Sequence, residues 1–299
     1  MAEVIFSPSG REASLSPAIA ESAAARLPPL IVAAERIAAT VMQGVHGRRR
    51  SGHGDAFWQF RPYTAGDAAA SVDWRQSAKA DRLFVRETEW EAAQTVLLWR
   101  DPSPSMQWRS SPRYEMKSHR AELLLLALAS LLLRGGERVR LLPGDRRSFM
   151  GRAALPALAA ALAVPLARPV PEASLELSVP RHARLVMFGD FLQPIPEIQA
   201  ALASFSARPV RGQMLQVMDP AEETLPYQGR IRFDGLEGEA PLLVPRVETI
   251  RALYAVRLAA HRAGISTMAR AAGWGFATHR TDQPPHAALL ALWQALAPA

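Results

Sequence analysis

The sequence lacks cysteine and several short motifs that mark common enzyme classes. Without cysteine no disulfide bond can form, which is compatible with a reducing cytoplasm. The chain has no Gly-x-x-x-x-Gly-Lys-Ser/Thr loop, so any ATP hydrolysis must come from a partner. No Gly-x-Ser-x-Gly surrounds Ser103 or Ser105, and no His-Glu-x-x-His pairs any of the seven histidines. These absences exclude three frequent kinds of enzyme.

Long hydrophobic runs are also missing. The most apolar stretch, LLLLALASLLL at 123–133, lies between Glu122 and Arg134 and is shorter than the roughly 20 residues that cross a bilayer. It predicts a helix that is buried on all sides. The N-terminal stretch has no basic start followed by an apolar core, so it does not resemble a secretory signal. We therefore expect no membrane insertion and a cytoplasmic location.

Lysine is nearly absent, although the chain is basic. The formal charge is +7, from 35 basic and 28 acidic residues, and Lys79 and Lys117 are the two lysines. A coding bias toward arginine explains this at least as well as nucleic-acid binding does. A basic surface nevertheless favours acidic partners.

Composition and the positions of proline and glycine divide the chain into three parts. A hydrophobic content of 49% with 21% charged residues is typical of a folded protein. Residues 1–27 are rich in Ala, Ser and Pro and predict a partly ordered arm. Residues 28–94 predict a helix, beginning at the Pro-Pro pair, and then a β-rich region broken by glycines. Residues 95–299 predict an α/β domain with a hairpin near 229–245.

Strands and helices alternate in this last part. Apolar runs typical of buried strands are followed by amphipathic or Ala/Leu-rich stretches typical of helices. This alternation predicts a doubly wound, mainly parallel sheet with helices on both faces. The expected strands are 95–99, 137–144, 182–190 and 212–219, and the expected helices are 112–134, 154–163, 194–207 and 246–272, followed by one more strand and a closing helix.

Oxygen-bearing side chains follow three of the expected strands. Asp101, Ser103 and Ser105 come directly after LLWR, Asp190 follows RLVMFG, and Asp219 follows QVM. Ligands bind beyond the carboxyl ends of strands in open α/β sheets, where the order of winding reverses. Carboxylate and hydroxyl oxygens suit Mg²⁺, Ca²⁺ or Mn²⁺ better than zinc. The simpler alternative is that these residues cap the helices that follow.

Two motifs carry a family resemblance. Asp101-Pro-Ser103-Pro-Ser105 resembles the metal-ion-dependent adhesion site of von Willebrand factor A domains. RPYTAGDAAASVDWRQSAKADRLFVRE resembles the signature of the bacterial family called domain of unknown function 58, in a match that runs from about residue 40 to 295 and includes the late HRTD at 279–282. The signature residues are Arg61, Tyr63, Gly66, Asp67, Asp73, Trp74, Ala78, Val85, Arg86 and Glu87.

The resemblance implies a fold, a partner and a metal. Family members join the β-rich signature to a von Willebrand factor A-like domain, and they are thought to act with MoxR-type AAA+ ATPases in chaperone-like or metal-insertion complexes. It implies a divalent cation, Mg²⁺, at Asp101, Ser103, Ser105 and Asp190. Many members have membrane helices ahead of the signature, and this sequence has none there.

Two departures from these patterns bear on the metal. Adhesion sites have a threonine ligand from a separate loop, but this chain has no threonine between Thr95 and Thr224, so Ser148 is the candidate replacement. The signature commonly has an arginine before Asp-Trp, where this chain has Ala68, Ala69 and Ala70. A degenerate site without metal is therefore the alternative.

The signature region allows two interpretations. Trp58, Phe60, Trp74 and Phe84 are expected to form the core of the β-rich unit. Its charged residues either pair internally or present a surface to the ATPase. The candidates for this role are Arg61, Asp67, Asp73 and Arg86, and Trp74 is added as an interaction residue.

The favoured function is that of a non-catalytic interaction module, an adaptor or co-chaperone for a MoxR-type ATPase. In its metal-dependent form, an acidic residue of the partner completes the coordination of the ion. The first alternative is a metal-dependent phosphoester hydrolase that uses Asp101, Asp190 and Asp219. The second is a nucleic-acid-binding protein in which Arg48, Arg49 and Arg50 contact phosphates.

Overall fold

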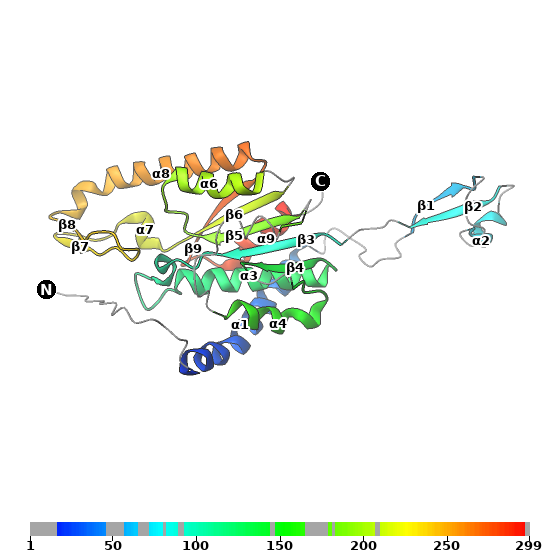
Figure 1. Ribbon diagram of the computed structural model, residues 1–299, viewed down its shortest axis with the longest axis horizontal. Coiled ribbons are helices and arrows are strands. Elements are labelled where there is room, and N and C mark those ends of the chain that lie inside the picture. Colours follow the sequence, from blue (N-terminus) through cyan, green and yellow to red (C-terminus); the bar gives the residue numbers. More distant parts are fainter. Residues whose placement is uncertain are drawn as a thin grey trace.

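The computed structural model of the protein has an α/β part and a smaller β-rich part, which lies along the chain between the first helix and the first strand of the α/β part (Figure 1). The α/β part is a single parallel sheet with helices on both faces. The structure describes residues 17–45, 57–64, 72–79, 82–88, 93–143, 147–164, 179–180, 183–206 and 210–296.

The central sheet has five strands, all paired in parallel. They are β3 (Thr95–Arg100), β4 (Arg138–Leu142), β5 (Arg184–Gly189), β6 (Arg211–Met218) and β9 (Gly275–Arg280), in the spatial order β4-β3-β5-β6-β9. The chain moves from β3 outward to β4 and then returns to the other side of β3 with β5. Winding therefore reverses between β3 and β5, which is the point where open α/β sheets bind ligands. The predicted mixed α/β fold with a mainly parallel sheet is confirmed.

Helices cover the two faces of the sheet in two separate hydrophobic clusters (Figure 1). Apolar residues of each helix face the sheet, as the sequence alternation predicts. One face carries α1 (Pro17–Val45), α3 (Lys117–Arg134), α4 (Leu155–Leu162) and α9 (Pro285–Ala295), and the other carries α6 (Ile195–Ser206) and α8 (Val247–Ala271).

Helix α3 is the most deeply buried helix among the described residues. It packs on α1, α4 and α9 as well as on the sheet, and Leu124, Leu128 and Leu131 are at most 1% exposed. The apolar run 123–133 is therefore a helix buried on all sides, as predicted. In the part of the chain that the structure describes, no helix has the length and apolar character needed to span a membrane.

Two helix boundaries differ from the predicted ones. Helix α1 begins at Pro17 rather than at Pro28, and both Pro28 and Pro29 lie inside it. The alanine-rich stretch before these prolines has high helix propensity, which offsets the hydrogen bonds that proline removes. Helix α3 begins at Lys117 rather than near Pro112. The residues between form turns, and the Ser111 hydroxyl accepts a bond from Arg113 N–H instead of capping α3.

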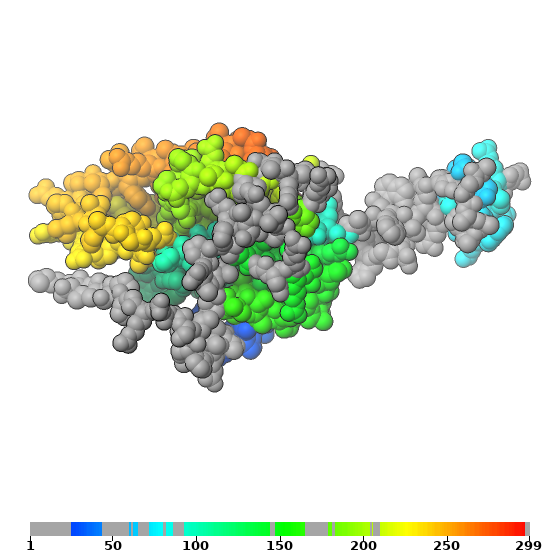
Figure 2. All heavy atoms as spheres, viewed as in Figure 1, coloured from blue at the N-terminus to red at the C-terminus, as the bar shows by residue number. Residues whose placement is uncertain are grey.

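Short elements complete the α/β part. They are the 3₁₀ turns η2 (Pro104–Gln107) and η3 (Arg152–Ala154), the helix α7 (Pro220–Thr224), and the strands β7 (Ile231–Phe233) and β8 (Leu242–Val244). Strands β7 and β8 pair in antiparallel fashion, so the hairpin predicted near 229–245 is confirmed. Figure 2 shows this hairpin, in yellow, projecting at one end of the molecule beside the N-terminal half of α8.

One edge of the sheet carries an isolated antiparallel bridge. Phe149 pairs with Val139 of β4 through two backbone hydrogen bonds of 2.8 and 2.9 Å. Val139 is aligned with Val96, near the start of β3. Because the bridge is antiparallel, Ser148 lies beside the middle of β4, on an exposed segment. It is not brought to the carboxyl ends of the strands, where the predicted metal site lies.

The β-rich part consists of β1 (Phe57–Pro62) and β2 (Phe84–Thr88), paired in antiparallel fashion, and the four-residue helix α2 (Trp74–Ser77). Phe60 and Phe84 meet edge to face with ring centroids 6.4 Å apart, as expected of a small core. Trp74 is 66% exposed, so its prediction as a core residue was wrong. It begins a helix of a single turn, and that helix directs the ring outward.

Only part of the signature can be placed in detail. The Asp73 carboxylate accepts a 2.9 Å bond from Gln76 N–H and caps α2, which holds the start of that helix in place.

Other residues of the signature region are described by their backbone alone. Arg61 lies in β1 opposite Val85, and Arg86 lies in β2 opposite Phe60. Their side chains lie outside the described residues, as does that of Trp58. Asp67 and the cluster Arg48, Arg49 and Arg50 also lie outside them.

Candidate functional site

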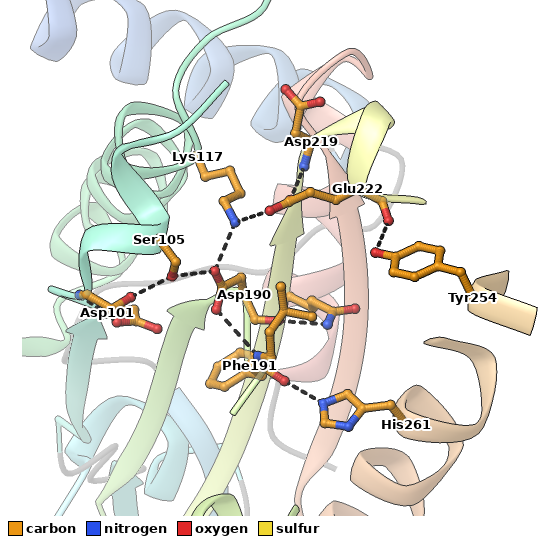
Figure 3. Close-up of polar contacts among 12 residues, drawn as sticks. Asp101, Ser105, Lys117, Asp190, Phe191, Asp219, Glu222, Tyr254 and His261 are labelled. Carbon is orange, nitrogen blue, oxygen red and sulfur yellow. Dashed lines mark hydrogen bonds and ion pairs between the residues drawn. The ribbon is translucent and has the colours of Figure 1, made fainter. Parts of the chain in front are cut away.

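The polar ends of β3, β5 and β6 form one network at the carboxyl edge of the sheet (Figure 3). Asp101, Asp190 and Asp219 each directly follow one of these strands, and all three are buried. We call this network the rim; it consists of Asp101, Ser103, Ser105, Lys117, Asp190, Asp219 and Glu222. The three strand-end carboxylates therefore lie at one edge of the sheet, as the sequence predicts.

The turn after β3 is built around Asp101. Its backbone N–H bonds to Phe188 O at 2.8 Å, and its Oδ1 accepts a 2.8 Å bond from Ser103 N–H. Ser103 and Ser105 exchange a 3.0 Å hydroxyl contact, which orients both toward the rim. Asp101 Oδ2 is buried and has no hydrogen-bond partner among the described residues. Burial raises the pKa of the Asp101 carboxyl, and the Asp190 and Glu237 charges raise it further, against the lowering effect of its bonds to Ser103.

Asp190 is the centre of the rim. Its Oδ2 accepts a 2.7 Å bond from the Ser105 hydroxyl and a 2.8 Å bond from the Lys117 ammonium. Its carbonyl oxygen accepts a 2.7 Å bond from Gln216, a fully buried side chain of β6. The turn of β3 and the turn of β5 are therefore joined at one carboxylate oxygen, across the point where winding reverses.

Lys117 reaches the rim from the first turn of α3. The side chain is completely buried, and its ammonium lies 2.8 Å from Asp190 Oδ2 and 2.5 Å from Glu222 Oε1. Figure 3 shows it between these two carboxylates. Burial alone would lower the pKa of Lys117, but the Glu222 and Asp190 charges outweigh it and the pKa is raised. The group is therefore a charged ammonium at neutral pH.

Asp219 and Glu222 form a capping box at the start of α7. Asp219 Oδ1 accepts from Ala221 N–H at 2.8 Å, and Glu222 Oε2 accepts from Asp219 N–H at 2.9 Å. Asp219 Oδ2 also accepts from Ser110 N–H at 2.9 Å, which ties α7 to the loop before α3. The capping interpretation of Asp219 is thus confirmed. Burial raises the pKa of the Glu222 carboxyl, an effect that Lys117 opposes.

A family model for the family described as "Protein of unknown function DUF58" matches residues 59–264. This match covers more than half of the chain and contains the signature residues and all seven residues of the rim. The chain belongs to this family. The description of the DUF58 family names no enzymatic activity. No curated protein matches the chain.

Two solved structures from Bacteroides are similar to this DUF58 chain. One is an aerotolerance-related membrane protein from Bacteroides fragilis NCTC 9343 with multiple mutations to serines, at 16% identity and a TM-score of 0.36 over 68% of this chain and 98% of that one. The other is the conserved hypothetical protein BatB from Bacteroides thetaiotaomicron, at 13% identity and a TM-score of 0.36 over 68% of this chain and 96% of that one.

The structure brings Asp101, Ser103, Ser105 and Asp190 together, and it adds residues that sequence reasoning missed. Lys117 and Glu222 complete the charge pairing, and Gln216 holds the backbone of Asp190. The sequence feature that could have drawn attention to Lys117 is its residue type, because it is one of two lysines in an arginine-rich chain. Glu222 stands three residues after Asp219, which is the spacing of a capping box.

The rim as it stands does not fit a divalent ion at Asp190. Mg²⁺ binds oxygens at about 2.0–2.1 Å and is usually held by one or two carboxylates. Asp190 Oδ2 already accepts a hydrogen bond from the positively charged ammonium of Lys117. Asp101 Oδ2 is then the remaining unpaired carboxylate oxygen of the motif in the described residues. Among these residues no cluster of three or more His, Asp or Glu side chains is arranged to hold a metal. Mg²⁺ at the four motif residues stays a prediction.

The late HRTD segment anchors α3 to the end of β9. Arg120 is buried and donates to Gln283 O at 2.7 Å and Thr281 O at 2.9 Å, and it lies 3.2 Å from His279 Nε2. It also donates to Glu115 at 2.7 Å. Burial, reinforced by the charge of Arg120, lowers the pKa of His279 to about 4. His279 is therefore neutral at physiological pH, and its role is structural.

Replacing Gly189 with alanine should displace Asp101. A Cβ at this position would lie 2.9 Å from Asp101 Oδ2 and 3.0 Å from Asp101 Cβ, too close for the buried side chain to remain in place. We expect a loss of about 1–3 kcal/mol in unfolding free energy, measured by urea titration. Gly135→Ala is the control, because a Cβ there meets its neighbours at 3.4 Å or more at a helical φ of −77°. Equal stability of the two variants would contradict this placement of Asp101.

Proposed function

We propose that this chain is a non-catalytic protein-interaction module that works as an adaptor or co-chaperone with a MoxR-type AAA+ ATPase. In this proposal the α/β part is a von Willebrand factor A-like domain. The Asp-x-Ser-x-Ser turn after β3 and its hydrogen bond to Asp190 after β5 support that assignment. The partner follows from the family resemblance of the signature region.

The observation that carries the proposal is the exposure of Trp74. A tryptophan that is 66% exposed is unusual for a residue whose side chain favours burial, and tryptophan is enriched among the residues that dominate binding energies. Asp73 caps the helix at Trp74, so the ring projects from a fixed backbone. Trp74 is also part of the family signature, and we infer that it is the anchor of the ATPase contact.

The bonding of the rim supports a non-catalytic role. A general base or a phosphate-binding metal needs a carboxylate that is free to act on a substrate. Asp190 and Glu222 are paired with Lys117, and both oxygens of Asp219 accept backbone N–H bonds. Asp101 Oδ2 has no hydrogen-bond partner among the described residues, but it is buried. The phosphoester hydrolase alternative has no supporting contact among these residues, and the nucleic-acid alternative rests on Arg48–Arg50, outside the described residues.

Trp74→Ala should weaken binding to the purified MoxR-type ATPase from the same genome at least about tenfold, which corresponds to 1.4 kcal/mol. The measurement is biolayer interferometry with immobilised full-length chain and with Mg²⁺ and a non-hydrolysable ATP analogue present throughout. Because the side chain is exposed, the variant should keep the wild-type melting temperature.

Val164→Ala is the matched control, because Val164 is also mostly exposed but lies beyond α4. It should bind as the wild type does. If the wild type does not bind the ATPase, the partnership is wrong. If it binds and Trp74→Ala binds equally well, Trp74 is not the anchor.

A further inference from the structure

We propose that the ammonium group of Lys117 is a built-in cation that takes the place of the divalent ion in the Asp-x-Ser-x-Ser rim. The rim is then complete without metal. This inference concerns the rim alone and does not depend on the identity of the partner. The Asp-x-Ser-x-Ser motif suggests a metal ion, but the structure has the Lys117 ammonium at Asp190 instead.

The ammonium bonds to the oxygen that an ion would need. Asp190 Oδ2 accepts from Lys117 Nζ at 2.8 Å and from the Ser105 hydroxyl at 2.7 Å. A divalent ion on that oxygen, at a distance of about 2 Å, would lie next to the ammonium charge in a buried environment, where charge repulsion is weakly screened. Lysine and ion therefore exclude each other at this carboxylate.

Lys117 also performs the structural task of an ion, which is to gather ligands from separate elements. Through Asp190 it holds the turn after β5, and through Ser105 it is linked to the turn after β3. Through Glu222 it holds α7, which follows β6. One buried positive charge thus connects the ends of three neighbouring strands.

The residue type fits this task. Arginine supplies nearly all the basic residues of the chain, yet lysine stands at the one fully buried cationic position among the described residues. An ammonium is a compact point charge whose donors point in several directions, whereas a guanidinium is planar and needs a fork-shaped acceptor. The compact group is the closer substitute for a spherical ion.

The position of Lys117 is otherwise unfavourable. It is the first residue of α3, an 18-residue helix with no acidic residue in its first turn. The N-terminus of a helix carries a partial positive charge and favours anions, so a lysine there is destabilising on its own. The buried position is also unfavourable for a cation unless it is paired. The Asp190 and Glu222 carboxylates offset both costs.

The test is Mn²⁺ binding by the full-length chain, followed by electron paramagnetic resonance and by the thermal shift on adding Mn²⁺ or EDTA. The wild type should show no site-bound Mn²⁺ and no shift. Lys117→Ala should gain one bound Mn²⁺ with a rise in melting temperature, and adding Asp101→Asn to that variant should abolish the gain. Lys79→Ala is the control for lysine removal, because Lys79 is exposed, and it should bind none.

Where Lys117→Ala does not fold alone, refolding it with and without Mn²⁺ gives the same comparison, and ion-dependent refolding supports the proposal. A wild type that binds one Mn²⁺ and loses it on Asp101→Asn would overturn the proposal. That result would leave the Trp74 contact with the ATPase unaffected, so the two proposals fail separately.

Discussion

Lys117→Met should lower the free energy of unfolding by about 3–5 kcal/mol, as expected when one partner of a buried ion pair is removed. Methionine fills a similar volume but leaves Asp190, which is 1% exposed, and Glu222 without their shared cation. The measurement is urea unfolding followed by circular dichroism at neutral pH. Lys79→Met is the control and should change stability by less than about 0.5 kcal/mol, because Lys79 is exposed.

The cause of this loss can be separated from simple packing. The triple variant Lys117→Met, Asp190→Asn, Glu222→Gln removes the two carboxylate charges together with the cation. It should recover part of the lost stability, because a neutral network replaces uncompensated buried charges. If the triple variant is less stable than Lys117→Met, the charge pairing described for the rim is not what stabilises it.

Acidification should destabilise the protein well above the pH at which carboxylates protonate. His279 is buried, and its pKa of about 4 in the folded state lies below the usual histidine pKa of 6.5. The unfolded chain therefore binds this proton first, so stability is full above pH 6.5 and falls as the pH drops from 6.5 to about 4. The expected loss is about 3 kcal/mol, at 1.36 kcal/mol for each pKa unit.

His279→Gln isolates this effect. Glutamine keeps a polar group beside Arg120 but does not titrate, so the fall between pH 6.5 and 4 should flatten. A second fall remains at lower pH, because hydrogen bonding to His119 and the nearby Arg120 hold the pKa of Glu115 down at about 2. The measurement is the urea unfolding free energy at a series of pH values. An unchanged pH profile in His279→Gln would contradict a neutral His279 in the folded state.

Much of the α/β part follows from local sequence. TVLLW and RLVMFG are continuous apolar runs, and they form β3 and β5, adjacent strands covered by helices on both faces. The run 123–133 is apolar on every side, and it forms the most buried part of α3. Strand-end polar residues then meet because parallel strands end at one edge. These features depend on periodicity and composition, which a sequence displays directly.

The features that the sequence did not reveal depend on long-range contacts. Lys117 and Asp190 are far apart along the chain, and nothing near Lys117 in sequence indicates its partners. The helix α1 continues through Pro28 and Pro29, because the alanine-rich flank and packing of its later turns outweigh the local penalty. Trp74 belongs to an aromatic-rich segment, so the pattern suggested a core, whereas α2 leaves its ring exposed.

The most direct test of the central claim is the amine signal of Lys117 in nuclear magnetic resonance. The chain has two lysines, so protein labelled with ¹⁵N-lysine should give two side-chain amine signals. We expect a slowly exchanging ammonium signal for Lys117, shifted in Asp190→Asn and unchanged by excess Mg²⁺, and a fast-exchanging one for Lys79. A Lys117 signal that exchanges as rapidly as that of Lys79, or that moves on adding Mg²⁺, would contradict a lysine that replaces the metal.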